Sequence, residues 1–315
     1  MDKVNTFTST GSKILGHLDV LGKVSAMGLA TPISLQVAPT SRCNLNCSFC
    51  SNVNRNKHED LDPENLAKFL LDMYQLGLKT VEWTGGGDPT MYEFINEMIM
   101  YAKGLGLEQG FITNGVALKE KLTQSSLDSL SWVRVSMNAV DYAKESFELP
   151  EIKGVLGFSY VVNDDMTQQS MVDMDAYVKR YNPAYVRMVP NCQTTYDQQM
   201  INNATLPAMV AKLGSPYFYQ AKTFDTPQRC WWGYFKPFLL HDGFIYPCSS
   251  VVLNEEADRQ FHDKYRWVHM SDAPEVLYAQ EMSNVSSDDC SHCVFASQNN
   301  LIDSIIHPGD MGNFI

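Results

Sequence analysis

Residues 33–190 alternate between short apolar runs and longer amphipathic segments, and this alternation limits the possible folds more than any other feature of the chain. The apolar runs predict strands and the segments between them predict helices. The expected strands are 33–37, 80–83, 109–113, 132–137, 157–163 and 185–189. Strands connected in this way pair in parallel with right-handed crossovers, and their carboxyl ends carry the reactive groups. The sequence therefore predicts an α/β fold with six βα units.

The helix after the first strand has the clearest boundaries. Asp62 and Pro63 are typical of an N-cap and a first helical turn, apolar residues follow at three- and four-residue intervals, and Gly77 ends the pattern. Further helices are expected over about 91–103 and 168–181. Beyond Pro190 the chain becomes polar, so a connecting segment is expected to residue 228, with helix only over 206–213.

Three cysteines lie between the first strand and that helix, in the run Cys43-Asn-Leu-Asn-Cys47-Ser-Phe-Cys50. An iron–sulfur cluster normally takes four thiolates, so a three-cysteine loop leaves one iron open to a small molecule. Structural zinc usually pairs Cys-x2-Cys with a second such pair or with histidines, and only His58 follows closely here. An iron–sulfur cluster is therefore favoured over zinc or over three unrelated buried thiols.

This loop resembles the signature of the radical S-adenosylmethionine (SAM) superfamily, Cys-x3-Cys-x-aromatic-Cys, with Phe49 in the aromatic place. The resemblance implies a partial (β/α)6 TIM-like barrel, which the strand count matches. It also implies a [4Fe–4S] cluster whose open iron chelates SAM, and a reducing partner such as flavodoxin or ferredoxin. An electron then cleaves SAM to a 5′-deoxyadenosyl radical, which takes a hydrogen atom from the substrate.

The second expected strand runs into a glycine-rich motif that ends in Asp88 and Pro89. Gly85, Gly86 and Gly87 allow the backbone to approach a ligand closely. The motif resembles the family's Gly-Gly-Glu-Pro, whose backbone and acid hold the SAM amino group, although Asp88 is one methylene shorter than Glu. A simple strand-to-helix turn is the alternative.

Polar residues also follow the third and fourth strands. Thr113 and Asn114 resemble the family's Thr-Asn-Gly, which lies near the SAM ribose or the substrate, although Asn-Gly is also a common turn. Arg134, Ser136 and Asn138 share one face of their strand. If that face is the barrel interior, a ligand must be present, because Arg is seldom buried without a partner. Ser136 with Asn138 fits the family's SAM-binding Ser-x-Asp, with Asn in place of Asp. The alternative is a solvent-facing edge strand.

Two residues at the sixth strand are candidates for ligand binding or catalysis. Arg187 is a charge within an apolar run, and it could pair with the SAM carboxylate or a substrate anion, or form an internal salt bridge. Cys192 follows the strand at the mouth of the barrel. As in some epimerising relatives, it could donate a hydrogen atom to a product radical, whereas a small apolar filler is the simpler interpretation.

The C-terminal part carries a second set of thiols: Cys230, Cys248, Cys290 and Cys293. A hairpin is expected over 235–247 with its turn at 241–243. The hairpin followed by Cys248 is similar to the twitch and SPASM extensions of radical SAM enzymes, and the resemblance implies an auxiliary [4Fe–4S] cluster on the four cysteines. A tetrahedral four-cysteine set also suits structural zinc.

These patterns divide the chain into five expected parts: an N-terminal extension over 1–32, the barrel over 33–190, a connecting segment over 191–228, an auxiliary-cluster domain over 229–295, and a C-terminal helix and tail over 296–315. The first part is too short for a winged-helix domain that would recognise a peptide leader. The net charge of −12, with no block of Lys or Arg, disfavours unaided binding to duplex nucleic acid. Without a signal pattern or a membrane-spanning run, a cytoplasmic protein is expected.

The sequence thus predicts a radical SAM enzyme of the oxidoreductase or isomerase type. A small-molecule, amino-acid or nucleoside-type substrate is favoured, and a ribosomal peptide or a conjugate in nucleic acid is the alternative. A hypothesis of another class is an iron–sulfur electron carrier that does not cleave SAM.

Overall fold

The structure, a computed structural model, describes residues 3–27, 32–52, 56–222, 225–250, 263–272 and 293–307. Cys290 and the rest of 273–292 therefore lie outside the described residues. Within the described part, no helix is both long and apolar enough to cross a membrane.

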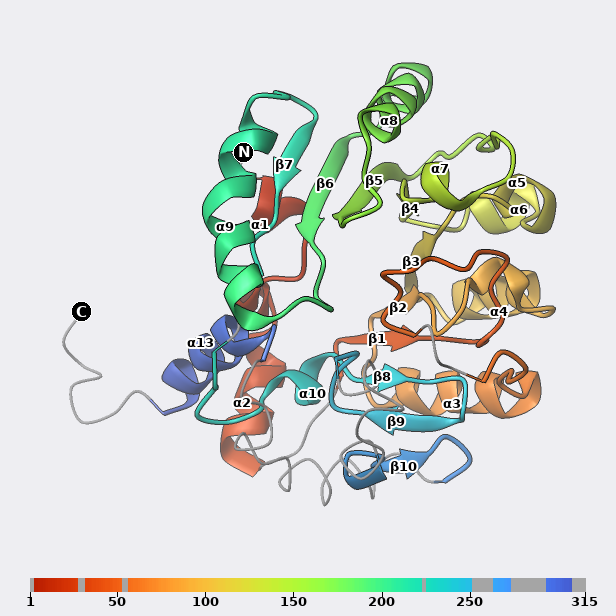
Figure 1. Ribbon diagram of the computed structural model, residues 1–315. Helices are drawn as coiled ribbons and strands as arrows, with labels where there is room; N and C mark the ends of the chain where they lie inside the picture. Colours follow the sequence, from red (N-terminus) through yellow and green to blue (C-terminus); the bar gives the residue numbers. More distant parts are fainter. Residues whose placement is uncertain are drawn as a thin grey trace.

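The strands of the described part form one curved sheet in the order β10-β9-β8-β1-β2-β3-β4-β5-β6-β7 (Figure 1). The parallel strands are β1 (Ser34–Val37), β2 (Thr80–Trp83), β3 (Glu108–Thr113), β4 (Trp132–Ser136), β5 (Val155–Val162), β6 (Tyr185–Pro190) and β7 (Tyr217–Tyr219). On the other side of β1 lie β8 (Phe238–Leu239), which is parallel to it, and the antiparallel β9 (Phe244–Tyr246) and β10 (Val268–His269). This arrangement is the expected partial TIM-like α/β fold.

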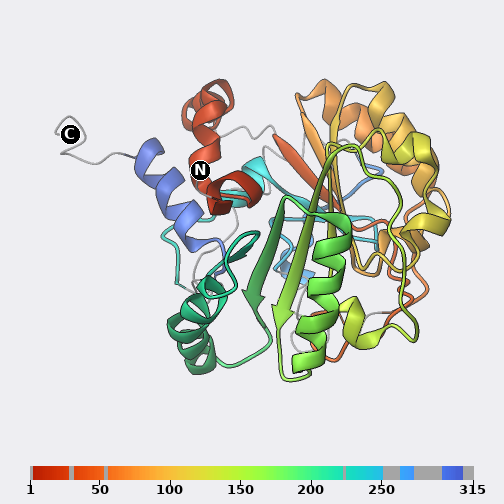
Figure 2. The same ribbon diagram turned by 90° about the horizontal axis from the view of Figure 1, so that it is seen from above.

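Helices cover the convex side of the parallel strands (Figures 1 and 2). They are α3 (Pro63–Gln75), α4 (Ile95–Gly104), α5 (Leu118–Lys121), α6 (Gln124–Leu127), α7 (Ala139–Tyr142), α8 (Gln168–Tyr181) and α9 (Tyr196–Ala211), with the 3-10 turn η2 (Pro89–Met91). The Asp62 side chain caps α3 by accepting from Asn65 N, as the sequence predicts, and Gly77 follows the helix with φ of 107°. The short α10 (Trp232–Phe235) precedes β8.

The N-terminal segment packs against the C-terminal helix. It consists of α1 (Lys3–Phe7), η1 (Gly11–Gly16) and α2 (Leu18–Met27), and the C-terminal helix is α13 (Ala296–Ile306). Figure 2 shows these two ends of the chain side by side. The contact is close, because a Cβ on Gly11 would lie 3.1 Å from the backbone of Gln298. Together they cover one open side of the sheet.

The expected helix over 206–213 is wrong in extent. The structure has a helix of 16 residues, α9, that begins at the Thr195 cap, and it adds the parallel strand β7 beyond residue 190. The apolar period of α9 is weak because it buries Gln199 and exposes Met200 and Ile201, and Pro207 lies inside it. Sequence periodicity underestimates such a helix, since tertiary contacts rather than an apolar stripe stabilise it.

The two faces of the parallel strands differ in polarity. Val37, Trp83, Phe111 and Val133 are fully buried in the core under the helices. Their neighbours along the strands point to the concave side, where Ser34, Glu82 and Arg134 are among the residues that line a cavity of about 570 Å³. The concave side is therefore a polar interior.

Candidate active site

The cysteine loop follows β1 directly, at the carboxyl edge of the sheet. Cys43, Cys47 and Cys50 are all partly buried, and the turn is closed by a hydrogen bond from Cys50 N to Cys47 O at 3.2 Å. Among the described residues, no three His, Cys, Asp or Glu side chains lie close enough together to bind one metal ion. A cubane cluster places a different iron at each thiolate, so its thiols stand further apart than the ligands of one zinc ion.

Tyr142, at the end of α7, fixes the outer side of this loop. Its hydroxyl lies 2.9 Å from Ser48 Oγ, and both hydroxyls donate to the Asp165 carboxylate. The Tyr142 ring also lies 5.9 Å from the ring of Phe49, the aromatic residue of the motif. Burial and the bond to Asp165 raise the pKa of Tyr142 to about 12, so it remains a donor at neutral pH. No pattern in the sequence marks Tyr142 or Asp165, because only the fold brings them to the loop.

The glycine motif after β2 touches the chain just before Cys43. Gly87 N donates to Thr40 O, and Asp88 N donates to Arg42 O, both at 2.8 Å. A Cβ on Gly87 would lie 1.9 Å from Arg42 O. Glycine is needed here because two backbone segments approach more closely than any side chain allows.

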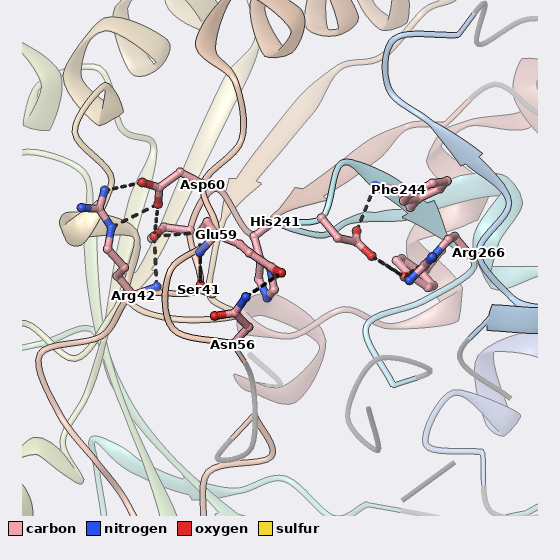
Figure 3. Close-up of polar contacts among 11 residues, drawn as sticks. Ser41, Arg42, Asn56, Glu59, Asp60, His241, Phe244 and Arg266 are labelled. Carbon is pink, nitrogen blue, oxygen red and sulfur yellow. Dashed lines mark hydrogen bonds and ion pairs between the residues drawn. The ribbon is translucent and has the colours of Figure 1, made fainter. Parts of the chain in front are cut away.

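The turn of the β8–β9 hairpin covers the middle of the same motif. The His241 side chain is fully buried, and a Cβ on Gly86 would lie 2.3 Å from His241 Cδ2. His241 Nδ1 lies 2.9 Å from the Glu59 carboxylate, and the Glu59 backbone pairs with Ser41 (Figure 3). Figure 3 also shows the neighbouring pair of Arg42 and Asp60, 2.6 Å apart. The hairpin therefore contacts both the glycine motif and the segment around the cysteine loop.

Asp88 links the glycine motif to the end of β3. Its buried carboxylate accepts from Thr90 N at 3.0 Å, Thr90 Oγ1 at 2.5 Å, Thr113 Oγ1 at 2.9 Å and Asn114 N at 2.6 Å. Burial raises the pKa of Asp88, and the hydrogen bonds from Thr90, Asn114 and Thr113 oppose that rise. The carboxylate thus orients the Thr113-Asn114 turn, and its expected contact with the SAM amino group stays a prediction.

Asn114 completes the connection to the cysteine loop. Its side-chain amide donates to Asn44 Oδ1 at 2.6 Å and lies 3.8 Å from Cys43 Sγ. Gly115 follows with φ of 82°, which permits the turn after β3. The structure therefore brings together the cysteine loop, the glycine motif and the Thr-Asn-Gly motif, as the sequence predicts.

The expected residues of β4 do not form one group. Asn138 is buried. Its side-chain oxygen accepts a hydrogen bond from Val161 N at 2.8 Å, and its side-chain nitrogen donates one to Val161 O at 2.9 Å. Ser136 lies in register with Ser159 at the carboxyl end of the strand. Arg134, by contrast, donates to Phe7 O at 2.8 Å and to Tyr185 Oη at 2.9 Å. None of the contacts between described residues joins Arg134 to the cysteine loop, so this arginine faces the interior without belonging to the motif cluster.

Cys192 and Arg187 lie at the other side of the carboxyl edge. Cys192 is exposed, but the surrounding protein raises the pKa of its thiol, while Lys222 opposes that rise and Cys50 adds to it. Cys192 is thus within electrostatic range of the third cysteine of the loop. Arg187 donates from Nη1 to Gln220 Oε1 at 3.1 Å, and its buried Nε has no partner among the described residues. Lys222 was not among the predicted site residues, because it lies in the segment expected to connect two domains.

Three of the four C-terminal cysteines are described. Asn299, at the start of α13, is buried, and its side chain accepts from Trp231 N at 2.7 Å and Trp232 N at 2.8 Å. The same side chain lies 3.8 Å from Cys293 Sγ, so it connects Cys293 to the residues that follow Cys230. Cys248 is buried in the small cluster that contains Trp232. Cys290 lies outside the described residues, so the full set stays a prediction.

Comparisons with known proteins agree with this arrangement. Residues 37–153 match the Radical SAM superfamily. The chain is 31% identical over 155 residues to the GTP 3′,8-cyclase of Aquifex aeolicus, covering 43% of this chain and 48% of that protein. It is 30% identical over 114 residues to the PqqA peptide cyclase of Bradyrhizobium diazoefficiens, covering 35% of this chain and 30% of that protein. The chain thus spans about half or less of these relatives.

Among solved structures, Streptococcus suis SuiB bound to S-adenosylmethionine is similar in fold, with a TM-score of 0.54 at 14% identity, covering 91% of this chain and 76% of that one.

Proposed function

We propose, from the premise that residues 37–153 form a radical SAM domain, that the chain is a radical SAM enzyme. In this proposal Cys43, Cys47 and Cys50 hold a [4Fe–4S] cluster that, when bound, supplies the electron for reductive cleavage of SAM. The observation that carries the proposal is the junction of three motifs through Asp88 and Asn114. The resulting 5′-deoxyadenosyl radical takes a hydrogen atom from a substrate carbon.

The residues around the loop bind and orient SAM in this proposal. The backbone of Gly85, Gly86 and Gly87 faces the SAM amino and carboxylate groups, and the buried Asp88 keeps that backbone and the Thr113-Asn114 turn in place. Ser136 contacts SAM from the end of β4, and Asn138 fixes the adjoining end of β5 through Val161. Phe49 shields the cluster on the side of Tyr142.

Cys192 is proposed as a hydrogen-atom donor to the product radical. Support comes from its exposure at the end of β6 and its electrostatic coupling to Cys50 and Lys222. Transfer of the S–H hydrogen atom to the product radical leaves a thiyl radical at Cys192, and an electron from the reducing partner with a proton from solvent restores the thiol. In D2O, the wild-type product should carry deuterium at the abstracted carbon. If Cys192→Ala yields the same labelled product at an unchanged rate, Cys192 is not the donor.

The C-terminal cysteines are proposed to hold an auxiliary [4Fe–4S] cluster in a twitch-like domain over 229–295. Asn299 supports this, because it connects Cys293 to the chain beside Cys230. Two clusters predict about eight iron atoms per chain. A Cys248→Ser variant should then retain about four, whereas zinc in the wild-type protein would identify a structural metal instead.

The substrate is proposed to be a small nucleoside-type molecule. The relative named GTP 3′,8-cyclase supports a nucleotide, and the relative named PqqA peptide cyclase supports a peptide as the second candidate. No disulfide joins any of the seven described cysteines, which fits a reducing compartment where flavodoxin or ferredoxin could supply electrons.

The proposed function is tested by anaerobic reconstitution with iron and sulfide, followed by dithionite and SAM. The wild-type chain and the surface variant Lys212→Gln should both form 5′-deoxyadenosine, and Cys43→Ala should form none. An intact, reducible cluster without any 5′-deoxyadenosine would support the electron-carrier hypothesis.

A further inference from the structure

The concave face of the barrel carries more positive than negative charge. Among the described residues, Arg134, Arg187, Lys222 and Lys236 act electrostatically on one another or on Glu82, the one carboxylate within this group. The whole chain has a net charge of −12. A cationic interior in so acidic a protein needs a local explanation.

Glu82 does not balance the whole group, because Lys236 already pairs with it. Lys236 Nζ lies 2.5 Å from Glu82 Oε1, and Gln36 donates to the other carboxylate oxygen at 3.2 Å. Arg134 uses neutral partners, the Phe7 carbonyl and the Tyr185 hydroxyl, and its guanidinium lies over the rings of Trp132 and Tyr185. The other two cations, Arg187 and Lys222, form no ion pair with a described residue, although Glu82 acts on Arg187 and the Cys192 thiol acts on Lys222 at longer range.

Arg187 and Lys222 have no carboxylate partner within ion-pair distance among the described residues. Arg187 makes one side-chain hydrogen bond, to Gln220, and its Nε is buried and unpaired. Burial and the nearby Arg134 lower the pKa of Arg187 to about 9, and Tyr185 and Glu82 oppose that change. Burial, Arg187 and Arg134 lower the pKa of Lys222 to about 8, and the Cys192 thiol opposes that change. Both residues are partly buried, and cations held away from water without an ion-pair partner destabilise a fold, so an anionic ligand would stabilise this pair.

The pair also lies where a substrate would meet the cluster loop. Arg187 is in register with Ser159 on β5, which is in register with Ser136 at the end of β4, so a polar row crosses the concave face. Lys222 follows β7 and acts on the Cys192 thiol, which in turn is within electrostatic range of Cys50. An anionic group at Arg187 and Lys222 would therefore anchor a molecule beside the reacting centre.

We propose that Arg187 and Lys222 bind a phosphate group of the substrate. The inference rests on the proposed function and narrows its substrate class to phosphate esters or nucleotides. A phosphate dianion neutralises both cations and accepts several hydrogen bonds from them, including one from Arg187 Nε. The SAM carboxylate is a single negative charge beside its own ammonium group, so it would leave the pair uncompensated.

The test measures binding of pyrophosphate and of SAM to the anaerobic, cluster-loaded chain by equilibrium dialysis. Wild-type protein should bind pyrophosphate saturably in the millimolar range or below. Arg187→Gln and Lys222→Gln should each weaken that binding by about tenfold or more, because each loses a charged hydrogen bond. The SAM dissociation constant should change much less. Lys212→Gln, an exposed lysine after α9, is the matched control and should bind pyrophosphate as the wild type does.

The outcomes separate the possible sources of the anion. Weaker SAM binding with unchanged pyrophosphate binding would assign the pair to the SAM carboxylate and overturn the proposal. Absent or non-saturable pyrophosphate binding, or an equal loss in Lys212→Gln, would also overturn it. Arg187→Lys, which keeps the charge, should regain part of the affinity, and iron content reports folding of every variant.

Formation of 5′-deoxyadenosine by the wild type and Lys212→Gln checks the proposed function separately. Its absence together with specific pyrophosphate binding would reject the SAM chemistry and keep the phosphate site.

Discussion

Replacing Lys222 with methionine is expected to stabilise the protein at pH 7 while removing phosphate binding. Burial, Arg187 and Arg134 lower the pKa of Lys222 from its ordinary 10.5 to about 8. At pH 7 Lys222 is protonated in both the native and the unfolded state, so the native state carries the cost of burying the charge and of its repulsion by Arg187 and Arg134. The difference between the two pKa values corresponds to about 3 kcal/mol. Because water reaches part of Lys222, we expect the free energy of unfolding to rise by about 1–3 kcal/mol.

The lowered pKa of Lys222 makes the stability difference between wild type and Lys222→Met depend on pH. The native state releases the Lys222 proton near pH 8, whereas the unfolded chain keeps it to about pH 10.5. Between these values the unfolded state binds more protons, so wild-type stability rises with pH relative to the methionine variant. The advantage of methionine should be full below pH 8 and should vanish by about pH 10.5. The charged or titratable groups that act on Lys222 are Arg187, Arg134 and Cys192.

The assay is anaerobic thermal unfolding of the cluster-loaded chain at one fixed heating rate, with Lys212→Met as control. For a chain of this size, 1 kcal/mol shifts Tm by roughly 2 °C, so Lys222→Met should gain about 2–6 °C at pH 7. Pyrophosphate should raise the Tm of the wild type and not that of Lys222→Met. A lower Tm for Lys222→Met at pH 7, or a gain that is equal at pH 7 and pH 10, would refute the reasoning.

Three further substitutions test the site. Gly87→Ala should lower iron content and SAM affinity by about tenfold or more, because its Cβ would lie 1.9 Å from Arg42 O. Gly104→Ala, with open space around it, is the control and should leave both quantities unchanged. Normal iron content and SAM affinity in Gly87→Ala would contradict the close backbone approach. Tyr142→Phe should speed loss of the first cluster under mild chelation by a few-fold, because the loop loses the hydroxyl that contacts Ser48 and Asp165. Retention equal to wild type would show that the hydroxyl does not anchor the loop. Asn299→Ala should lower Tm by about 2–6 °C and reduce the iron content of the auxiliary cluster, because two buried N–H groups lose their acceptor. An unchanged iron content would show that Asn299 does not support the auxiliary cluster.

The fold was predictable from sequence where local patterns and tertiary packing agree. The second strand, 80–83, and the helix 168–181 match the structure residue for residue, because burial alternates along the strand and a capping box of Thr167 and Ser170 begins the helix. Helix α9 was largely missed because it buries a glutamine and exposes apolar residues. Its stability depends on contacts with β6 and β7, which no local pattern reports.

The site was predictable to the extent that its residues form short motifs. The cysteine loop, the glycine motif and Thr113-Asn114 meet as expected, since the carboxyl ends of adjacent parallel strands meet at one edge. Strand alternation put Arg134 on the polar face of its strand, and the structure shows that this face is the interior. Alternation does not give the depth along the barrel or the contact with Phe7. Tyr142 and His241 act through single tertiary contacts, so no pattern in the chain marked them.

The C-terminal region determines which cations of the interior are available to a ligand. Strand β8 pairs with β1, and this pairing places Lys236, just before β8, against Glu82 on β2. The same hairpin places His241 against Gly86 in the glycine motif. Because Lys236 already pairs with Glu82, that carboxylate is not available to form an ion pair with Arg187 or Lys222. The segment that carries Lys236 and His241, about 150 residues after the glycine motif, thus shapes the proposed SAM site. Because Lys236 also occupies Glu82, the positive charges of Arg187 and Lys222 stay available to an anionic substrate.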